Sequence, residues 1–166
     1  TMFTKITLEN FRSFDHIELD LTEKGNTAKH LAILYGENGA GKSNLMSAFV
    51  LLPELTRTMD ARAAYERILA QGAIFQDENM EKEMREHIRQ RLRDMSAIIK
   101  DYQMADCENP IIAEYEFNID GNNGCYRVEF GQDEILHERL EFVLNRRRGL
   151  YFDCSVTAVS YTHLRA

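Results

Sequence analysis

The sequence has little proline and cysteine and no tryptophan. Its 166 residues include two prolines, nine glycines and three cysteines, which excludes a collagen-like or low-complexity chain. Cys107, Cys125 and Cys154 are widely spaced, and an odd number without a C-x-x-C pair argues against a disulfide framework or a zinc site. No apolar run approaches the roughly 18 residues of a membrane span, and no signal peptide is recognisable. We therefore expect a cytoplasmic protein that does not enter a membrane.

Basic residues are outnumbered by acidic ones, 20 lysines and arginines against 27 aspartates and glutamates, which gives a net charge of -7. This excludes a generally basic nucleic-acid wrapper but leaves room for a local basic face. Two arginine groups are candidates, namely Arg85, Arg89 and Arg93 at four-residue spacing and the triplet at 146–148. Contact with nucleic acid is one interpretation. A solvated helix face is favoured for the first group, because acidic residues share that segment. A charged hairpin loop is favoured for the triplet, because basic triplets are common on surfaces.

Alternating apolar and polar residues predict β-strands near both ends of the chain. Glycine and asparagine at 120–124 predict a hairpin loop, and the strands around it predict an antiparallel meander. The predicted strands cover residues 5–8, 17–21, 113–119, 126–130 and 136–144. Glu138 falls on the apolar face of the last strand, where a carboxylate needs a partner. We expect an ion pair between Glu138 and Arg127.

The segment Leu31–Tyr35 has a different pattern, because it is apolar throughout. Such a short run is typical of a central strand that is covered on both faces. A glycine-rich loop follows from Gly36. After the loop, apolar residues at helical spacing predict a helix over residues 44–52, which Pro53 is expected to end. Its apolar stripe consists of Leu45, Phe49 and Leu52.

Residues 54 to about 105 lack any strand pattern and predict a helical insertion in an α/β core. Asp60 is a candidate N-cap of one helix, and Gly72 a candidate end. A second helix is predicted over about 23 residues from Asp77, with an apolar stripe expected to pack inward. The stripe consists of Met80, Met84, Ile88, Leu92, Met95 and Ile99.

The glycine-rich loop carries the clearest chemical signal. Its spacing is that of a P-loop, G-x-x-x-x-G-K-S. Backbone N–H groups of such a loop point at phosphate oxygens, the lysine adds a cation, and the serine hydroxyl binds Mg²⁺. The sequence therefore predicts a site for ATP and Mg²⁺, with Ser43 as the metal ligand. The predicted nucleotide-binding residues are Gly36, Glu37, Asn38, Gly39, Ala40, Gly41, Lys42, Ser43 and Asn44.

The N-terminal region resembles ABC-type ATPases of the SMC, RecF and OLD kind. The resemblance rests on residues 5–14, Lys-Ile-Thr-Leu-Glu-Asn-Phe-Arg-Ser-Phe, and on the form of the loop at 36–44. Residues 111–153 more loosely resemble AAA-family proteins of the abortive-infection or OLD-like type. The resemblance implies an α/β P-loop NTPase head that forms a homodimer around nucleotide. It also implies that Arg12 approaches the nucleotide, although a solvated turn arginine is the favoured alternative.

The chain departs from this family in lacking a signature motif, a Walker B strand and a switch histidine, and no Q-loop glutamine can be assigned. Hydrolysis needs the Walker B carboxylates, so we expect the head to be incomplete and this chain alone not to turn over ATP. Whether it belongs to an enzyme stays open, with an ATPase as the expected parent. Two functions are weighed: part of an ATPase in DNA-related or phage-defence processes, and a nucleotide-gated clamp or sensor whose insertion binds nucleic acid or an effector protein.

These observations divide the chain into four parts. Residues 1–53 are expected to hold the first strands, the P-loop and its helix, 54–109 the insertion, and 110–153 further antiparallel strands of the same core. Residues 154–166 are expected to be a truncated end. Within it, 159–166 read like a translated sequencing-adapter peptide, which we exclude from fold reasoning.

Overall fold

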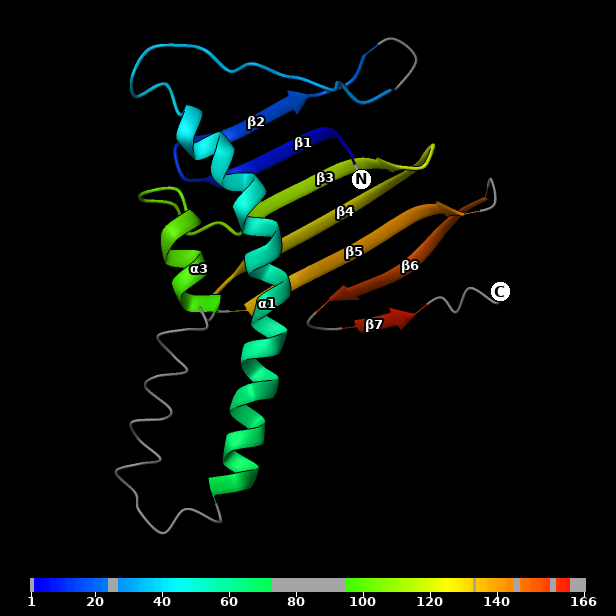
Figure 1. The fold of residues 1–166 in the computed structure, drawn as a ribbon. Coiled ribbons are helices and arrows are strands. Elements are labelled where there is room, and N and C mark those ends of the chain that lie inside the picture. Colours follow the sequence, from blue (N-terminus) through cyan, green and yellow to red (C-terminus); the bar gives the residue numbers. More distant parts are fainter. Residues whose placement is uncertain are drawn as a thin grey trace.

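Seven strands form one antiparallel sheet in the order β2-β1-β3-β4-β5-β6-β7. The computed structural model describes residues 2–23, 27–72, 95–132, 134–144, 147–155 and 158–161. Figure 1 shows both helices of this part on one face of the sheet, with β2 and β7 at its two edges. The strands are β1 (Met2–Phe11), β2 (Phe14–Asp20), β3 (Ile111–Ile119), β4 (Asn122–Gly131), β5 (Glu134–Leu144), β6 (Arg147–Ser155) and β7 (Ala158–Tyr161).

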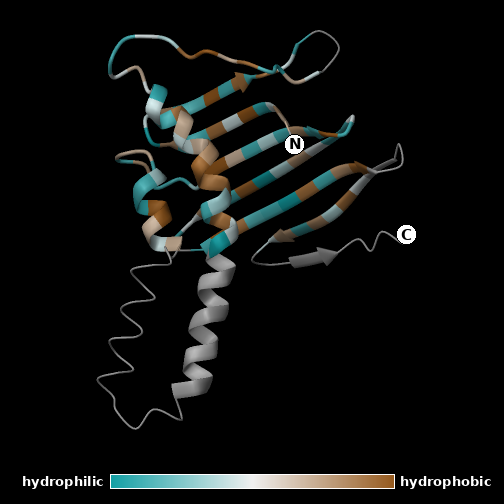
Figure 2. Ribbon diagram, in the orientation of Figure 1, coloured by the Kyte–Doolittle hydropathy of each residue, from teal (hydrophilic) through white to brown (hydrophobic). Residues whose placement is uncertain are grey.

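The strand predictions are confirmed and extended. β1 pairs with β2 and also with β3, so that Ile6 lies opposite Tyr115. The predicted hairpin joins β3 and β4, where Asp120 and Gly121 both have positive φ angles of 51° and 80°. Two successive left-handed residues suit the twist of a two-residue hairpin. Hydrophobic and hydrophilic residues alternate along these strands (Figure 2).

Two strands were not predicted, β6 and β7. β7 pairs with β6 from Ala158 to Tyr161, so part of the segment that we excluded from fold reasoning lies in the sheet. This pairing does not test the origin of that segment. All strand pairs in the described part of the chain are antiparallel. The described architecture therefore combines strands and helices, as an antiparallel sheet with two helices on one face.

The prediction that Pro53 ends the first helix is wrong. α1 runs from Lys42 to Gly72 with Pro53 inside it. An internal proline costs a helix about 3 kcal/mol, because one backbone hydrogen bond is lost. Leu51 and Leu55, on either side of it, are 0% and 3% exposed. Burying each leucine contributes about 1.5–3 kcal/mol, so packing on the sheet offsets the proline. The predicted N-cap at Asp60 is also wrong, because Asp60 lies inside this continuous helix. The helix is described as far as Gly72, and its predicted end there stays a prediction.

The end of the predicted inward-facing stripe is also confirmed. α3 (Met95–Tyr102) buries Ile98, Ile99 and Tyr102, and Met95 packs against the core. The other members of the stripe, the arginine row and the side chains of the triplet lie outside the described residues. The predicted hairpin loop at 146–148 is wrong in part, because Arg147 and Arg148 belong to β6 and pair with β5. The limits of the insertion stay a prediction.

The prediction of a central strand at Leu31–Tyr35 is wrong. In the described residues this segment joins no strand, and Leu31, Ile33 and Tyr35 are 76%, 74% and 92% exposed. After β2 the chain stays at the sheet edge only as far as Lys29, whose N–H donates to the carbonyl of Leu21 at 2.7 Å. Beyond that point no strand of the described residues pairs with its backbone groups. An apolar stretch is visible in the open segment that leads to α1 (Figure 2).

The core lies between the sheet and the two helices. Tyr115 is fully buried, and its hydroxyl donates to the carbonyl of Ala48 in α1 at 2.7 Å. Phe3 packs edge-on against Phe49, with ring centroids 5.6 Å apart. These contacts fix the N-terminal half of α1 across the sheet. They thereby fix the place where the glycine-rich loop ends, because α1 begins at Lys42.

Candidate functional site

The glycine-rich loop is a sharply turned segment directly before α1. Gly39 and Gly41 have φ angles of 89° and 81°, in the left-handed region that favours glycine. The N–H of Ala40 donates to the carbonyl of Glu37 at 3.3 Å, which closes a turn inside the loop. An added Cβ at Gly39 would meet no atom within 4 Å. The loop is therefore open on that side.

Lys42 folds back over this loop. Its Nζ donates to the carbonyl of Gly36 at 2.7 Å and to that of Glu37 at 2.6 Å. Both partners are backbone oxygens of the loop itself. The ammonium therefore lies against the backbone of the loop, at the place where a P-loop holds phosphate.

The N-terminus of α1 adds positive potential at the same place. The helix begins at Lys42, and the N–H of Leu45 donates to the carbonyl of Gly41 at 2.9 Å. No acidic residue lies in its first turn. Free N–H groups and the helix dipole favour an anion at such an end. Ser43, the predicted metal ligand, is exposed there.

The turn between β1 and β2 packs against the loop. Nδ2 of Asn44 donates to Oγ of Ser13 at 2.8 Å. A Cβ added at Gly41 would lie 2.7 Å from Cζ of Phe14, closer than real Cβ atoms come to a neighbour. Asn44 was predicted at the site, and the family resemblance implied that the turn at Arg12 and Ser13 lies near the loop, but no contact was predicted for Ser13 or Phe14. No local pattern signals these contacts, because the partners lie about 30 residues apart.

Arg12, the other predicted nucleotide contact, lies over Tyr102. Its Cζ is 4.8 Å from the centre of the Tyr102 ring, and its backbone N–H donates to the carbonyl of Tyr102 at 2.7 Å. Within the described residues its Nε is buried without a hydrogen-bond partner. The structure therefore brings the neighbours Ser13 and Phe14 to the loop and packs Arg12 against α3.

Glu138 lies on the helix-facing side of β5, but its predicted partner is wrong. The hydroxyl of Tyr126 donates to Oε1 of Glu138 at 2.7 Å, while Arg127 pairs with Glu114 at 3.5 Å. Arg127 is one residue further along β4 than Tyr126, so its side chain points to the opposite face of the sheet. Burial, and then the bond to Glu138, raises the pKa of the Tyr126 hydroxyl far above its usual value.

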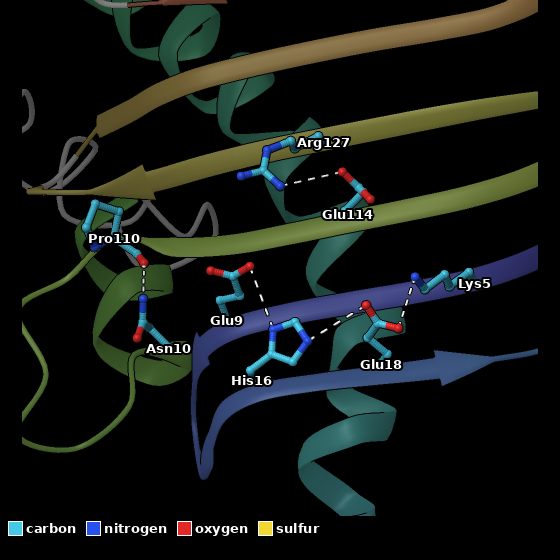
Figure 3. A network of polar contacts seen from close by, with 8 residues as sticks. All are labelled: Lys5, Glu9, Asn10, His16, Glu18, Pro110, Glu114 and Arg127. Carbon is cyan, nitrogen blue, oxygen red and sulfur yellow. Dashed lines mark hydrogen bonds and ion pairs between the residues drawn. The ribbon is translucent and has the colours of Figure 1, made fainter.

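The uncovered face of the sheet carries paired charges. Figure 3 shows Lys5 beside Glu18, His16 between Glu9 and Glu18, and Arg127 beside Glu114. Exposed pairs of this kind contribute little to stability. A cavity of about 520 Å³ on β3–β5 is lined by charged side chains, among them Glu116 and Arg139. None of its lining residues belongs to the glycine-rich loop.

In the described part of the chain, no group of three or more histidine, cysteine, aspartate or glutamate side chains is arranged to hold a metal ion. In the same residues, neither helix combines the length and the apolar character that crossing a bilayer requires.

The N-terminal region that contains the glycine-rich loop is similar to known proteins. Residues 5–57 match the AAA domain family. A stretch of 49 residues is 41% identical to the DNA replication and repair protein RecF of Bacillus mycoides (strain KBAB4). Residues 5–57 belong to a P-loop ATPase head of the SMC/RecF type. The match to RecF spans 30% of this chain and only 12% of the relative.

The match of this region to the AAA domain family implies nucleotide binding, and the loop has the corresponding features. Two left-handed glycines turn its backbone, the Lys42 ammonium lies within it, and the helix N-terminus faces it. The exposed hydroxyl of Ser43 stands at that same end. The parts that a P-loop needs on the side of the protein are therefore present in one place.

Proposed function

We propose that this protein binds ATP and Mg²⁺ in the loop at 36–43, as the N-terminal part of an ABC-type ATPase head. The observation that carries the proposal is the place of Lys42, whose ammonium bridges two carbonyls across the loop. When phosphate binds, the ammonium would donate to phosphate oxygens in place of these two carbonyls. Ser43 would supply its hydroxyl to Mg²⁺, which neutralises charge on the phosphates when bound.

The residues around Lys42 would hold the phosphates. The N–H groups of 38–43 would donate to phosphate oxygens, for which the N–H of Ala40 would leave the carbonyl of Glu37. The dipole of α1 would add to that attraction. Arg12 is proposed as a further contact, which requires its guanidinium to leave the ring of Tyr102. Its unpartnered Nε supports this role, since a buried donor gains from meeting an anion.

Substitution of Lys42 tests the proposal. Lys42→Ala removes a charge-assisted hydrogen bond, worth about 1–3 kcal/mol, so ATP binding by the full-length protein should weaken about 5- to 150-fold. Isothermal titration with Mg·ATP measures this. Lys29→Ala is the matched control, because Lys29 donates to the carbonyl of Asp20 away from the loop. Equal affinity of wild type and Lys42→Ala would refute the assignment.

We also propose which process the binding of ATP drives. RecF acts, by its name, in DNA replication and repair, and we propose a DNA-related role here, with phage defence by OLD-like relatives as one setting. A second copy of the head would close the nucleotide site. Binding of labelled DNA with and without ATP, at two salt concentrations, tests this role. DNA affinity that does not change with nucleotide would contradict it.

A nucleotide-gated clamp or sensor is the second candidate. It is favoured by the continuity of α1, which runs without interruption from the P-loop lysine to Gly72. A helix of 31 residues is about 46 Å long, so a shift at its N-terminus would be carried into the insertion. The insertion would then present nucleic acid or an effector protein with a surface whose position depends on ATP.

A further inference from the structure

The turn between β1 and β2 touches the nucleotide loop at two points. One is the hydrogen bond of 2.8 Å from Nδ2 of Asn44 to Oγ of Ser13. The other is Gly41, where an added Cβ would lie 2.7 Å from Cζ and 2.9 Å from Cε1 of Phe14. Glycine at 41 is thus required twice, for its positive φ and for the close approach of the Phe14 ring.

The same turn is fixed on its other side by α3. The N–H of Arg12 donates to the carbonyl of Tyr102 at 2.7 Å, and the N–H of Met104 donates to the carbonyl of Asn10 at 3.0 Å. Asn10 and Arg12 have φ angles of 53° and 52°. Side-chain-bearing residues adopt this region at a cost, and persist in it only where the surroundings hold them. The turn is therefore a rigid piece between α3 and the P-loop.

We propose that this turn is a positioning element of the nucleotide site. Ser13 holds Asn44 and Phe14 holds the backbone at Gly41, so that the end of the loop and the first turn of α1 are in place before phosphate arrives. The inference rests on the proposed function. Its physical reason is that a loop ordered in advance spares the ligand the entropic cost of ordering it.

This role predicts a specific pattern of ATP affinities. Loss of one neutral hydrogen bond should weaken Mg·ATP binding about 2- to 12-fold in Ser13→Ala and in Asn44→Ala. The double variant should bind no more weakly than either single one, because both changes remove the same contact. Ser13→Thr keeps the hydroxyl and should restore wild-type affinity.

The experiment measures Mg·ATP affinity of the full-length protein by isothermal titration, at a temperature where every variant is folded. Thr56→Ala is the matched control. It removes a hydroxyl of α1 that donates to the carbonyl of Pro53 at 2.9 Å, more than three helical turns beyond the loop. Its affinity should equal that of the wild type. Thermal unfolding without nucleotide, recorded in parallel, separates altered affinity from altered stability.

Three results would overturn the inference. The first is wild-type affinity in Ser13→Ala and Asn44→Ala while Lys42→Ala is impaired, which leaves the proposed function standing. The second is additive losses in the double variant, which would mean that the two side chains act separately. The third is a wild type that binds no nucleotide, which removes the proposed function and the inference together.

Discussion

Alanine substitution at two glycines of the P-loop separates backbone strain from packing. Gly39 and Gly41 have similar φ angles of 89° and 81°. Alanine in the left-handed region costs about 1–2 kcal/mol, so both variants should lose that amount. The two sites differ in their surroundings. A Cβ at Gly39 meets nothing within 4 Å, while one at Gly41 comes within 2.7 Å of the Phe14 ring.

The difference between the two variants measures this contact. Phe14 packs against the core, so it can move aside only by disturbing its neighbours. Inserting a methyl group into a packed region costs about 1–3 kcal/mol. Gly41→Ala should therefore lose about 1–3 kcal/mol more of the free energy of unfolding than Gly39→Ala. Urea denaturation without nucleotide measures both, with the slope of the transition as a check on two-state behaviour.

A third substitution identifies the cause of that difference. With Phe14→Ala as the background, the ring is gone and the nearest remaining neighbour of the added Cβ is Oγ of Ser13 at 3.3 Å. Most of the difference between Gly41→Ala and Gly39→Ala should then disappear. Equal losses in the wild-type background would refute the reasoning, and so would a difference that persists undiminished after Phe14 is removed.

Three further outcomes are expected from the described contacts. Tyr126→Phe leaves the Glu138 carboxylate without its 2.7 Å donor and should cost about 1–3 kcal/mol in urea denaturation; an unchanged midpoint would contradict this. Burial raises the pKa of Tyr115 and Tyr126 above the usual value of 10.0, so the folded state keeps protons that the unfolded state loses. Stability from these groups should be complete below about pH 10 and fall as the pH rises above it, and absorbance at 295 nm should show them ionising only with unfolding. Finally, Ile33→Glu should reduce hydrophobic-dye binding of the 166-residue polypeptide without lowering its stability, since Ile33 is 74% exposed; dye binding equal to that of the wild type would mean that other surfaces bind it.

The candidate site illustrates what local sequence can predict. The spacing from Gly36 to Ser43 predicts the loop, because its glycines and its lysine all lie within eight consecutive residues. The same glycines have positive φ angles in the structure. The structure places the start of α1 at Lys42, as the motif requires. The family resemblance placed the turn at Arg12 and Ser13 near this loop, but it did not predict the contacts of Ser13 with Asn44 or of Phe14 with Gly41.

Helix and strand periodicity was equally informative where the pattern is local. The alternation in 5–8 and 113–119 predicts strands, and these segments lie in β1 and β3 respectively. The stripe ending at Met95 and Ile99 predicts an inward face, and α3 packs that face on the core. Each prediction depends only on which neighbours along the chain share a face, and backbone geometry fixes that.

By itself the sequence determined the period of β1 to β5 and of the first turns of α1, the hairpin after Ile119 and the position of the glycine-rich loop. Tertiary structure decided which strands pair, and it placed β1 beside β3, about 100 residues further along the chain. It also let α1 continue through Pro53, because the leucines on both sides are buried on the sheet. It left Leu31–Tyr35 exposed, since an apolar run becomes a strand only where another strand meets its backbone hydrogen-bonding groups. Pairing and burial are long-range interactions, so no window of sequence contains both partners.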